Sequence, residues 1–121
     1  MQDELFQVVF YGKPDGTEPA KVFLDALDAK MFAKMIRAIE ILRVGGTSVR
    51  EPYSKHLDDG IFEVRAQVGS NLSRVLYFFV AGRRMILTHG FTKKTQKTPP
   101  SEIEQAKKYR SEYLGREVNQ E

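Results

Sequence analysis

The sequence contains no cysteine, no tryptophan and only two histidines among its 121 residues. Without cysteine, the chain can form neither a disulfide nor a thiolate metal site. Two histidines would need carboxylates beside them to complete a zinc site. The composition therefore argues against a disulfide-stapled secreted fold and against a zinc protein.

Long apolar runs are also missing. No segment approaches the roughly 18 apolar residues of a membrane span. The first residues, MQDELFQVVFYG, begin with acids and lack the basic start and the long apolar stretch of a signal peptide. We therefore expect a cytoplasmic protein that does not contact a membrane.

Hydrophobic residues make up 41% of the chain, which is enough to build a core and is unlike the composition of a disordered sequence. The length is typical of one domain. We expect a single domain over residues 1–116, followed by a frayed C-terminal tail over residues 117–121.

Positive charge is concentrated in the C-terminal part of the sequence. Residues 1–82 hold 10 Lys and Arg against 11 Asp and Glu, whereas residues 83–116 hold nine against three. A basic region on a nearly neutral scaffold is the electrostatic pattern of a protein that binds a polyanion. The alternative is a basic C-terminal helix that is merely solvated.

Hydrophobic periodicity predicts an α+β fold. The expected elements, in chain order, are a strand over residues 5–11, a helical hairpin over residues 17–44 that breaks near residues 28–30, an ordered loop over residues 46–60, strands over residues 61–68, 72–80 and 84–91, and a helix from Pro100. Because short turns separate the last three strands, these should form an antiparallel meander. The expected fold is a compact antiparallel sheet of the N-terminal strand and this meander, with an N-terminal helical hairpin and a C-terminal helix.

Turn length sets the predicted register of the first two meander strands. Apolar residues alternate cleanly in the first of them, which directs Glu63 and Arg65 away from the core. A two-residue turn at residues 70–71 then places Val64 opposite Tyr77.

The same reasoning applies to the second turn of the meander. A two-residue turn at residues 81–82 places Arg74 opposite His89. A shift of this register by two residues would keep the faces, whereas a three-residue turn would reverse them. One polar face should therefore carry Glu63, Arg65, Arg74 and His89, on a strand that leads to Lys93 and Lys94. The alternative is a solvated face with one Glu–Arg ion pair and a packed histidine.

Three segments resemble a known family. The strings KHLDDGIFEVRAQ, SRVLYFF and HGFTKKTQKTPPSEIEQA, in this order and at these spacings, are similar to the RelE/HigB superfamily of toxins from bacterial toxin–antitoxin pairs. They most resemble its phage-derived, HigB-like branch, of which F-x-KKTQKTP followed by a helix is typical. The similarity runs from about Leu5 to Tyr113.

The resemblance implies a RelE-like antiparallel sheet with helices packed on one face. It also implies an mRNA interferase, an endoribonuclease that cleaves messenger RNA, commonly on the ribosome. Such toxins use no metal or cofactor, because the RNA 2′-hydroxyl attacks the neighbouring phosphate. The implied partners are mRNA, the ribosome and a cognate antitoxin, which we expect to be a helix-turn-helix repressor.

The resemblance also assigns the phosphate-stabilising residues. Arg74 matches the arginine of the family's R-V-x-Y strand and is expected to stabilise the phosphate, because a guanidinium offers rigid, permanently charged donors. Arg65 matches a basic position of the preceding strand. Lys93 lies where the family places basic residues, at the end of the last strand.

The acid and the base of the reaction are less sharply indicated. Glu51 resembles a catalytic glutamate that some members carry, and Glu63 is the alternative base. His89 is the candidate acid because the ordinary pKa of histidine lies near neutrality, or else it is a structural residue. The residues expected to bind RNA are Lys55, His56, Arg84, Lys94 and Lys97, of which Lys55 and His56 are also catalytic alternatives.

Two rival activities fit the same sequence. A ParE-like protein would inhibit DNA gyrase by binding it and would have no nuclease site. A non-catalytic member would bind RNA or the ribosome without cutting. Cleavage of bound RNA separates the interferase from the second rival, and inhibition of supercoiling with intact RNA would identify the first.

Overall fold

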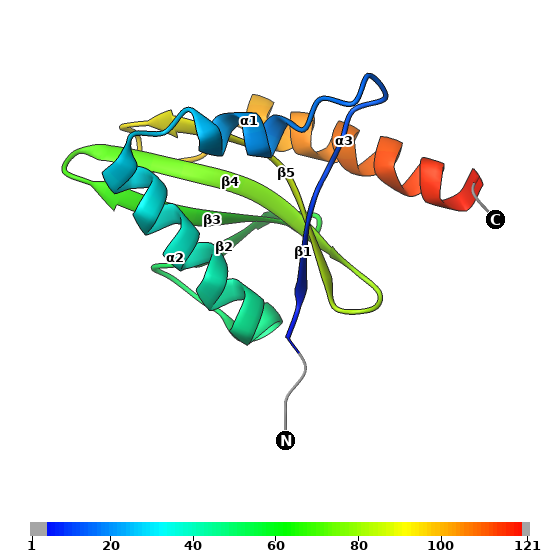
Figure 1. Cartoon of the computed structure of the whole chain (residues 1–121), viewed down its shortest axis with the longest axis horizontal. Coiled ribbons are helices and arrows are strands. Elements are labelled where there is room, and N and C mark those ends of the chain that lie inside the picture. Colours follow the sequence, from blue (N-terminus) through cyan, green and yellow to red (C-terminus); the bar gives the residue numbers. More distant parts are fainter. Residues whose placement is uncertain (1–4, 120–121) are drawn as a thin grey trace.

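The computed structural model describes residues 5–119 and contains one five-stranded sheet with three α-helices (Figure 1). The elements are β1 (Gln7–Phe10), α1 (Pro19–Asp25), α2 (Ala29–Gly45), a short 3₁₀ turn η1 (Gly46–Ser48), β2 (Ser54–Asp58), β3 (Ile61–Val68), β4 (Asn71–Val80), β5 (Arg84–Lys93) and α3 (Pro100–Asn119). The strand order is β1-β5-β4-β3-β2. Neighbouring strands run antiparallel except β1 and β5, which are parallel. The predicted α+β class is confirmed.

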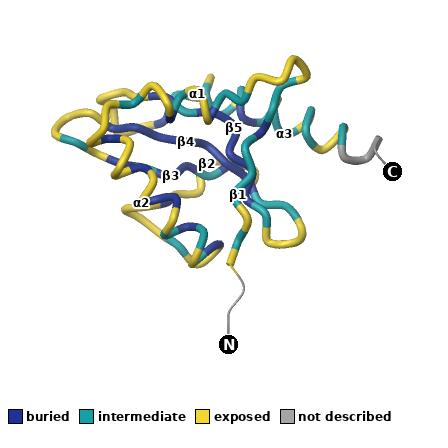
Figure 2. The backbone as a smooth tube through the Cα atoms, in the orientation of Figure 1, coloured by how far each residue is buried: buried dark blue, intermediate teal, exposed yellow. Residues whose placement is uncertain are grey.

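The helices lie on both faces of the sheet, so the expectation of helices on one face is wrong. Helices α1 and α2 pack on one face, over a core that includes Met35, Leu42 and Val75. Helix α3 packs on the other face, where Ala106 meets Phe78 and its neighbours. Strand β4 therefore lies between two apolar layers and is buried along most of its length (Figure 2).

The helical hairpin forms where the sequence predicts it. The chain breaks between α1 and α2, and the Asp28 side chain caps α2 by accepting a hydrogen bond from the Met31 amide at 2.9 Å. An N-cap carboxylate satisfies an amide that has no partner within the helix. The break turns the apolar stripe of α2 onto the sheet.

Strand β2 lies inside the segment that was expected to be a loop. It pairs antiparallel with β3, with Lys55 opposite Glu63, and it forms one edge of the sheet. Its sequence, SKHLD, has a single apolar residue, and most of its side chains are exposed. A short polar edge strand gives almost no periodic signal, which explains why it was missed.

The register of the β3–β4 hairpin differs from the prediction by two residues. The turn consists of residues 69–70, so Phe62 rather than Val64 lies opposite Tyr77, and Val64 lies opposite Val75. A shift by two residues leaves every side chain on its predicted face.

The β4–β5 hairpin contains two irregularities that compensate for each other. Its turn has three residues, 81–83, which would reverse the predicted faces. A β-bulge at Thr88 adds one residue to β5 and restores them. Arg74 consequently lies opposite Phe91, not His89, but both Arg74 and His89 remain on the face covered by α3.

Helix α3 is tied to the segment after β1 by Tyr11. Tyr11 stacks on Tyr109 with ring centroids 4.7 Å apart, and its hydroxyl donates to Glu112 at 2.9 Å. Burial and this carboxylate raise the pKa of Tyr11 to about 12.

Helix α3 continues to Asn119, three residues into the segment expected to fray, and residues 120–121 lie outside the described residues. Among the described helices, none is long and apolar enough to cross a membrane.

Candidate functional site

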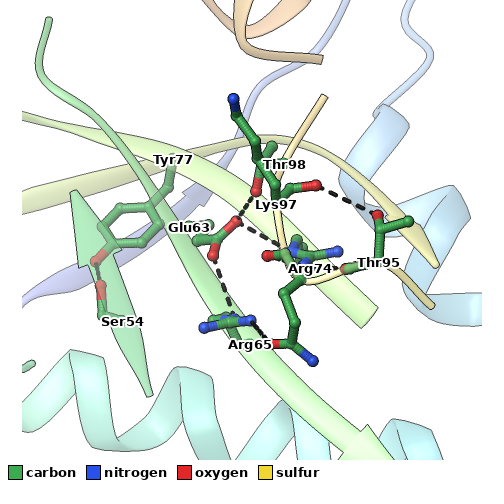
Figure 3. A network of polar contacts seen from close by, with 9 residues as sticks. Ser54, Glu63, Arg65, Arg74, Tyr77, Thr95, Lys97 and Thr98 are labelled. Carbon is green, nitrogen blue, oxygen red and sulfur yellow. Dashed lines mark hydrogen bonds and ion pairs between the residues drawn. The ribbon is translucent and has the colours of Figure 1, made fainter. Parts of the chain in front are cut away.

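The predicted polar face contains a charged cluster on β3 and β4. Glu63 and Arg74 are 1% and 0% exposed. The Glu63 carboxylate lies 3.3 Å from Nε of Arg74 and 3.2 Å from Nε of Arg65 (Figure 3). Two guanidinium groups therefore share one carboxylate, and the cluster keeps an excess of positive charge.

The β5–α3 loop, residues 94–99, covers this cluster. The carbonyl oxygens of Thr95 and Gln96 each accept a hydrogen bond from Nη2 of Arg74 at 2.6 Å, and the Thr98 hydroxyl donates to Glu63 (Figure 3). Arg74, which was expected to stabilise the phosphate, is therefore covered by the loop and closed to solvent. Burial lowers the pKa of Arg74, against the opposing effect of the Glu63 carboxylate.

The loop does not satisfy every donor of the cluster. Nε and Nη1 of Arg74 and Nε of Arg65 are buried and make no hydrogen bond of good geometry with the described residues. The two Nε atoms still lie within ion-pair distance of Glu63. Arg74 thus holds the loop carbonyls in place but does not reach solvent.

His89 lies in the interface between the sheet and α3. Its Nε2 is 2.9 Å from Glu102, its Nδ1 is 3.1 Å from the Thr88 hydroxyl, and its ring meets the edge of Tyr109 at 5.6 Å. Burial lowers the pKa of His89, and the Glu102 carboxylate opposes that shift. A mostly neutral, packed imidazole is a poor candidate for a proton donor to bound RNA.

Three other predicted residues lie at opposite ends of β5. Lys93 and Lys94 are exposed where β5 ends. Arg84 lies at the opposite end of β5 and donates hydrogen bonds to the Ala81 carbonyl and to the Tyr113 hydroxyl. These three cations are therefore not brought to one site.

The remaining predicted residues meet along β2, where three cavities adjoin one another. The first, here called the β2 cavity, has a volume of about 640 Å³ and is lined by Arg50, Glu51, Lys55, His56 and others. The second, the loop cavity, has a volume of about 320 Å³ and is lined by Lys55, His56, Glu63, Gln96, Lys97 and others.

The third cavity lies beside α2 and is called the α2 cavity. Its volume is about 380 Å³, and its lining includes Lys34, Arg37, Tyr53, Arg65, Gln67 and Gln96. The β2 and loop cavities share Lys55 and His56, and the loop and α2 cavities share Gln96. Together the three form a concave, predominantly cationic band around the β2 edge of the sheet.

His56 has a defined orientation within this band. Its Nε2 accepts a hydrogen bond from the Gly60 amide at 3.1 Å, and its ring meets Phe62 edge-on at 5.0 Å. In the neutral ring the proton is therefore on Nδ1. An oriented imidazole and the exposed carboxylate of Glu51 line the same cavity.

Sequence reasoning missed the contribution of α2 and of the segment before β2. Lys34 and Arg37 lie between core positions of α2, and the helical pattern marks them only as solvent-facing. Arg50 and Tyr53 lie in the segment expected to be a loop.

Within residues 5–119, no group of three or more histidine and carboxylate residues could hold a metal ion.

The sequence matches a known protein family over most of its length. The model of a protein family described as "Phage derived protein Gp49-like (DUF891)" matches residues 22–111, which are 90 of the 121 residues. The match extends from α1 into α3 and includes all of β2, β3, β4 and β5. No curated protein matches the sequence.

Proposed function

Because this chain belongs to the phage-derived Gp49-like family, a toxin-like family in general, we propose that it is a RelE/HigB-type toxin that cleaves RNA in the band along β2. The observation that carries the proposal is the composition of the β2 cavity. Glu51 and His56 line it together with the cations Arg50 and Lys55, on a surface that an RNA chain can reach. A carboxylate, an imidazole and two cations can supply the base, the acid and the charge stabilisation that phosphoryl transfer in RNA requires.

The proposed reaction needs only groups of the protein and of the RNA. The 2′-oxygen forms a bond to the adjacent phosphorus while the bond from phosphorus to the 5′-oxygen breaks. A base takes the 2′ proton, and an acid gives a proton to the 5′-oxygen. The products are a 2′,3′-cyclic phosphate and a free 5′-hydroxyl.

The cavity suggests a role for each residue. Glu51, the exposed carboxylate, takes the 2′ proton. The leaving oxygen receives its proton from His56 or Lys55, which border both the β2 and the loop cavities. Arg65 and Lys97 add positive charge beside the transferring phosphate. Arg74 acts as a positioning residue because it fixes the β5–α3 loop that carries Lys97.

The proposal includes the setting in which the toxin works. The substrate is messenger RNA, bound to the ribosome, in the cytoplasm. A cognate antitoxin of the helix-turn-helix type neutralises the toxin by covering the cationic band or by placing a helix in a groove of the surface.

A non-catalytic RNA-binding protein is the second candidate. It is favoured by the burial of Arg74, which the resemblance selects for phosphate stabilisation, and of His89, the candidate acid. Such a protein would use the same cationic band to bind RNA without cutting it.

Cleavage by the purified protein separates these readings. Labelled RNA is incubated with wild type and with Glu51→Gln, both as naked RNA and in a cell-free translation reaction. We expect new 5′-hydroxyl and cyclic-phosphate ends with wild type, at a rate that Glu51→Gln lowers by about 10²- to 10⁴-fold.

Glu40→Gln is the matched control, because Glu40 is an exposed carboxylate on α2 that pairs with Arg43 of the same helix. It should cleave like wild type. Intact RNA with wild type in both reactions would refute the nuclease and leave the RNA-binding protein. Inhibition of gyrase supercoiling with intact RNA would instead identify a ParE-like activity.

A further inference from the structure

The α2 cavity combines three cations with no acid. Lys34 and Arg37 reach it from α2, and Arg65 reaches it from β3. The lining includes no Asp or Glu, although one of its three cations, Arg65, pairs with the Glu63 carboxylate outside the lining. Such a cavity attracts an anionic ligand.

Two of these cations are held in fixed positions. Nζ of Lys34 donates to the Gln67 carbonyl at 2.9 Å. Arg65 is held by the Glu63 carboxylate and by Oε1 of Gln96, which accepts from its Nη2 at 3.2 Å. The cations are therefore oriented before a ligand arrives, which lowers the entropic cost of binding.

The rest of the lining suits a flat, polar ring. Ala38, Ala66 and Leu72 form an apolar floor. Tyr53 is 40% exposed, and its carbonyl accepts a hydrogen bond from the Arg65 amide at 3.0 Å, which ties its backbone to β3. An exposed tyrosine that is fixed beside an apolar floor is a stacking surface for a nucleobase.

Two amide side chains are available to the edge of such a ring. Nε2 of Gln67 donates to the Gly69 carbonyl, which leaves Oε1 of Gln67 as an acceptor. Oε1 of Gln96 accepts from Arg65, which leaves Nε2 of Gln96 as a donor. One acceptor and one donor can discriminate between bases.

We propose that the α2 cavity is a nucleotide subsite for single-stranded RNA. Arg37 and Lys34 bind a phosphate, Tyr53 stacks on the base, and the two glutamines contact the base edge. Gln96 also lines the loop cavity, so the bound nucleotide is a near neighbour of the cleaved one. This inference rests on the proposed function for the identity of the ligand. It adds the site at which the protein would distinguish one RNA sequence from another.

Binding to an RNA that cannot be cut tests the subsite apart from the chemistry. The probe is a short single-stranded RNA in which every 2′-hydroxyl is methylated, since this removes the attacking group. The dissociation constant of the whole chain is measured by fluorescence anisotropy at several salt concentrations. The variants are Arg37→Gln, Tyr53→Ala and, as a control on the same helix, Lys30→Gln, which is exposed and outside the lining.

We expect Tyr53→Ala to weaken binding about tenfold, the usual loss for one stacked base. Arg37→Gln should weaken binding and reduce the slope of log K against log salt by about 0.7, the value for one phosphate of a single strand. Tyr53→Phe should bind like wild type because it keeps the ring. Thermal unfolding of each variant shows whether the fold is intact.

The outcomes separate this inference from the proposed nuclease. Weaker binding by Arg37→Gln and Tyr53→Ala, with no cleavage by wild type on normal RNA, supports the subsite and refutes the nuclease. Binding by both variants equal to that of Lys30→Gln refutes the subsite, whether or not wild type cleaves. The subsite is also refuted if a polyglutamate peptide displaces the RNA probe as well as unlabelled RNA does and Tyr53→Ala has no effect on binding. That result would indicate an acidic protein segment as the ligand.

Discussion

Glu63 is the carboxylate on which the charged cluster depends. It is almost fully buried, and it faces Arg65, Arg74 and the Thr98 hydroxyl. A buried charge is tolerated only when it is paired, and removing one partner leaves the other charge uncompensated. The buried Arg74 and the partly buried Arg65 therefore both depend on this single side chain.

We predict that Glu63→Gln lowers the free energy of unfolding by about 3–5 kcal/mol, the usual cost of breaking a buried ion pair. Chemical denaturation measures it. Glu40→Gln, which breaks the exposed pair with Arg43 within α2, should cost no more than about 0.5 kcal/mol. Equal losses in the two variants would mean that the cluster contributes nothing to stability.

At the residue scale, sequence reasoning predicted the face of the sheet on which Glu63 and Arg74 lie. It did not predict that a loop buries them. The period of two directs Glu63 away from the core, the turn length places Arg74 on the same face, and the structure confirms that the two share a face. Alternation says nothing about the path of a loop. The burial of Arg74 follows from the β5–α3 loop, whose sequence, KTQKTP, has no period to interpret.

Helix α1 packs closely against β5 at Gly90. A Cβ on Gly90 would lie 2.3 Å from Cδ2 of Phe23, which is closer than carbon atoms approach. Gly90 therefore permits the close contact of α1 with the sheet.

We predict that Gly90→Ala destabilises the protein by about 1–3 kcal/mol, the usual cost of overpacking. Gly115→Ala is the matched control, because Gly115 lies in exposed α3 with no atom near the added methyl. It should stabilise by up to about 1 kcal/mol through helix propensity. Melting temperatures that shift in the same direction would contradict this account.

At the element scale, periodicity predicted the helical hairpin and the meander because their apolar residues recur over many positions. Strand β2 has five residues and lies at an edge, so it lacks that signal. The candidate site lies along this strand. Prediction from the sequence therefore identified Glu51, Lys55 and His56 but not the surface that joins them.

His89 links the sheet to α3, so its ionisation affects the whole molecule. Burial lowers its pKa, and the folded state therefore binds its proton only at a lower pH than the unfolded state does. Between the lowered pKa and the ordinary value near 6.5, the unfolded state holds more protons. The neutral ring of His89 therefore contributes its full stabilisation above the ordinary pKa. This contribution is lost as the pH falls from the ordinary pKa to the lowered one.

We predict that the unfolding free energy of wild type decreases as the pH falls from 7 to 5, and that His89→Gln reduces this dependence. Glu102→Gln should increase the loss, because it removes the carboxylate that raises the pKa of His89. Denaturation at a series of pH values measures both effects. The same slope in all three proteins would show that His89 does not control acid stability.

Charge at the scale of the whole molecule is distributed differently from charge along the chain. The sequence places its excess of cations after residue 82, but Lys107 and Arg110 of α3 pair with Asp58 and Asp59. Cations of α2, β2, β3 and the β5–α3 loop instead line the concave band. Segment charge predicted a polyanion partner, and only the fold indicates the surface that would bind it.

The three-residue turn and the bulge at Thr88 also constrain how this hairpin can change in length. Each irregularity alone would invert the inward and outward sides of β5, and together they cancel. A deletion of one residue in the turn would exchange the side chains that face α1 and α2 with those that face α3, unless a second deletion removed the bulge. Among relatives, the number of residues in the turn and the bulge together should therefore change by two rather than by one. Insertions and deletions in this hairpin should occur in coupled pairs.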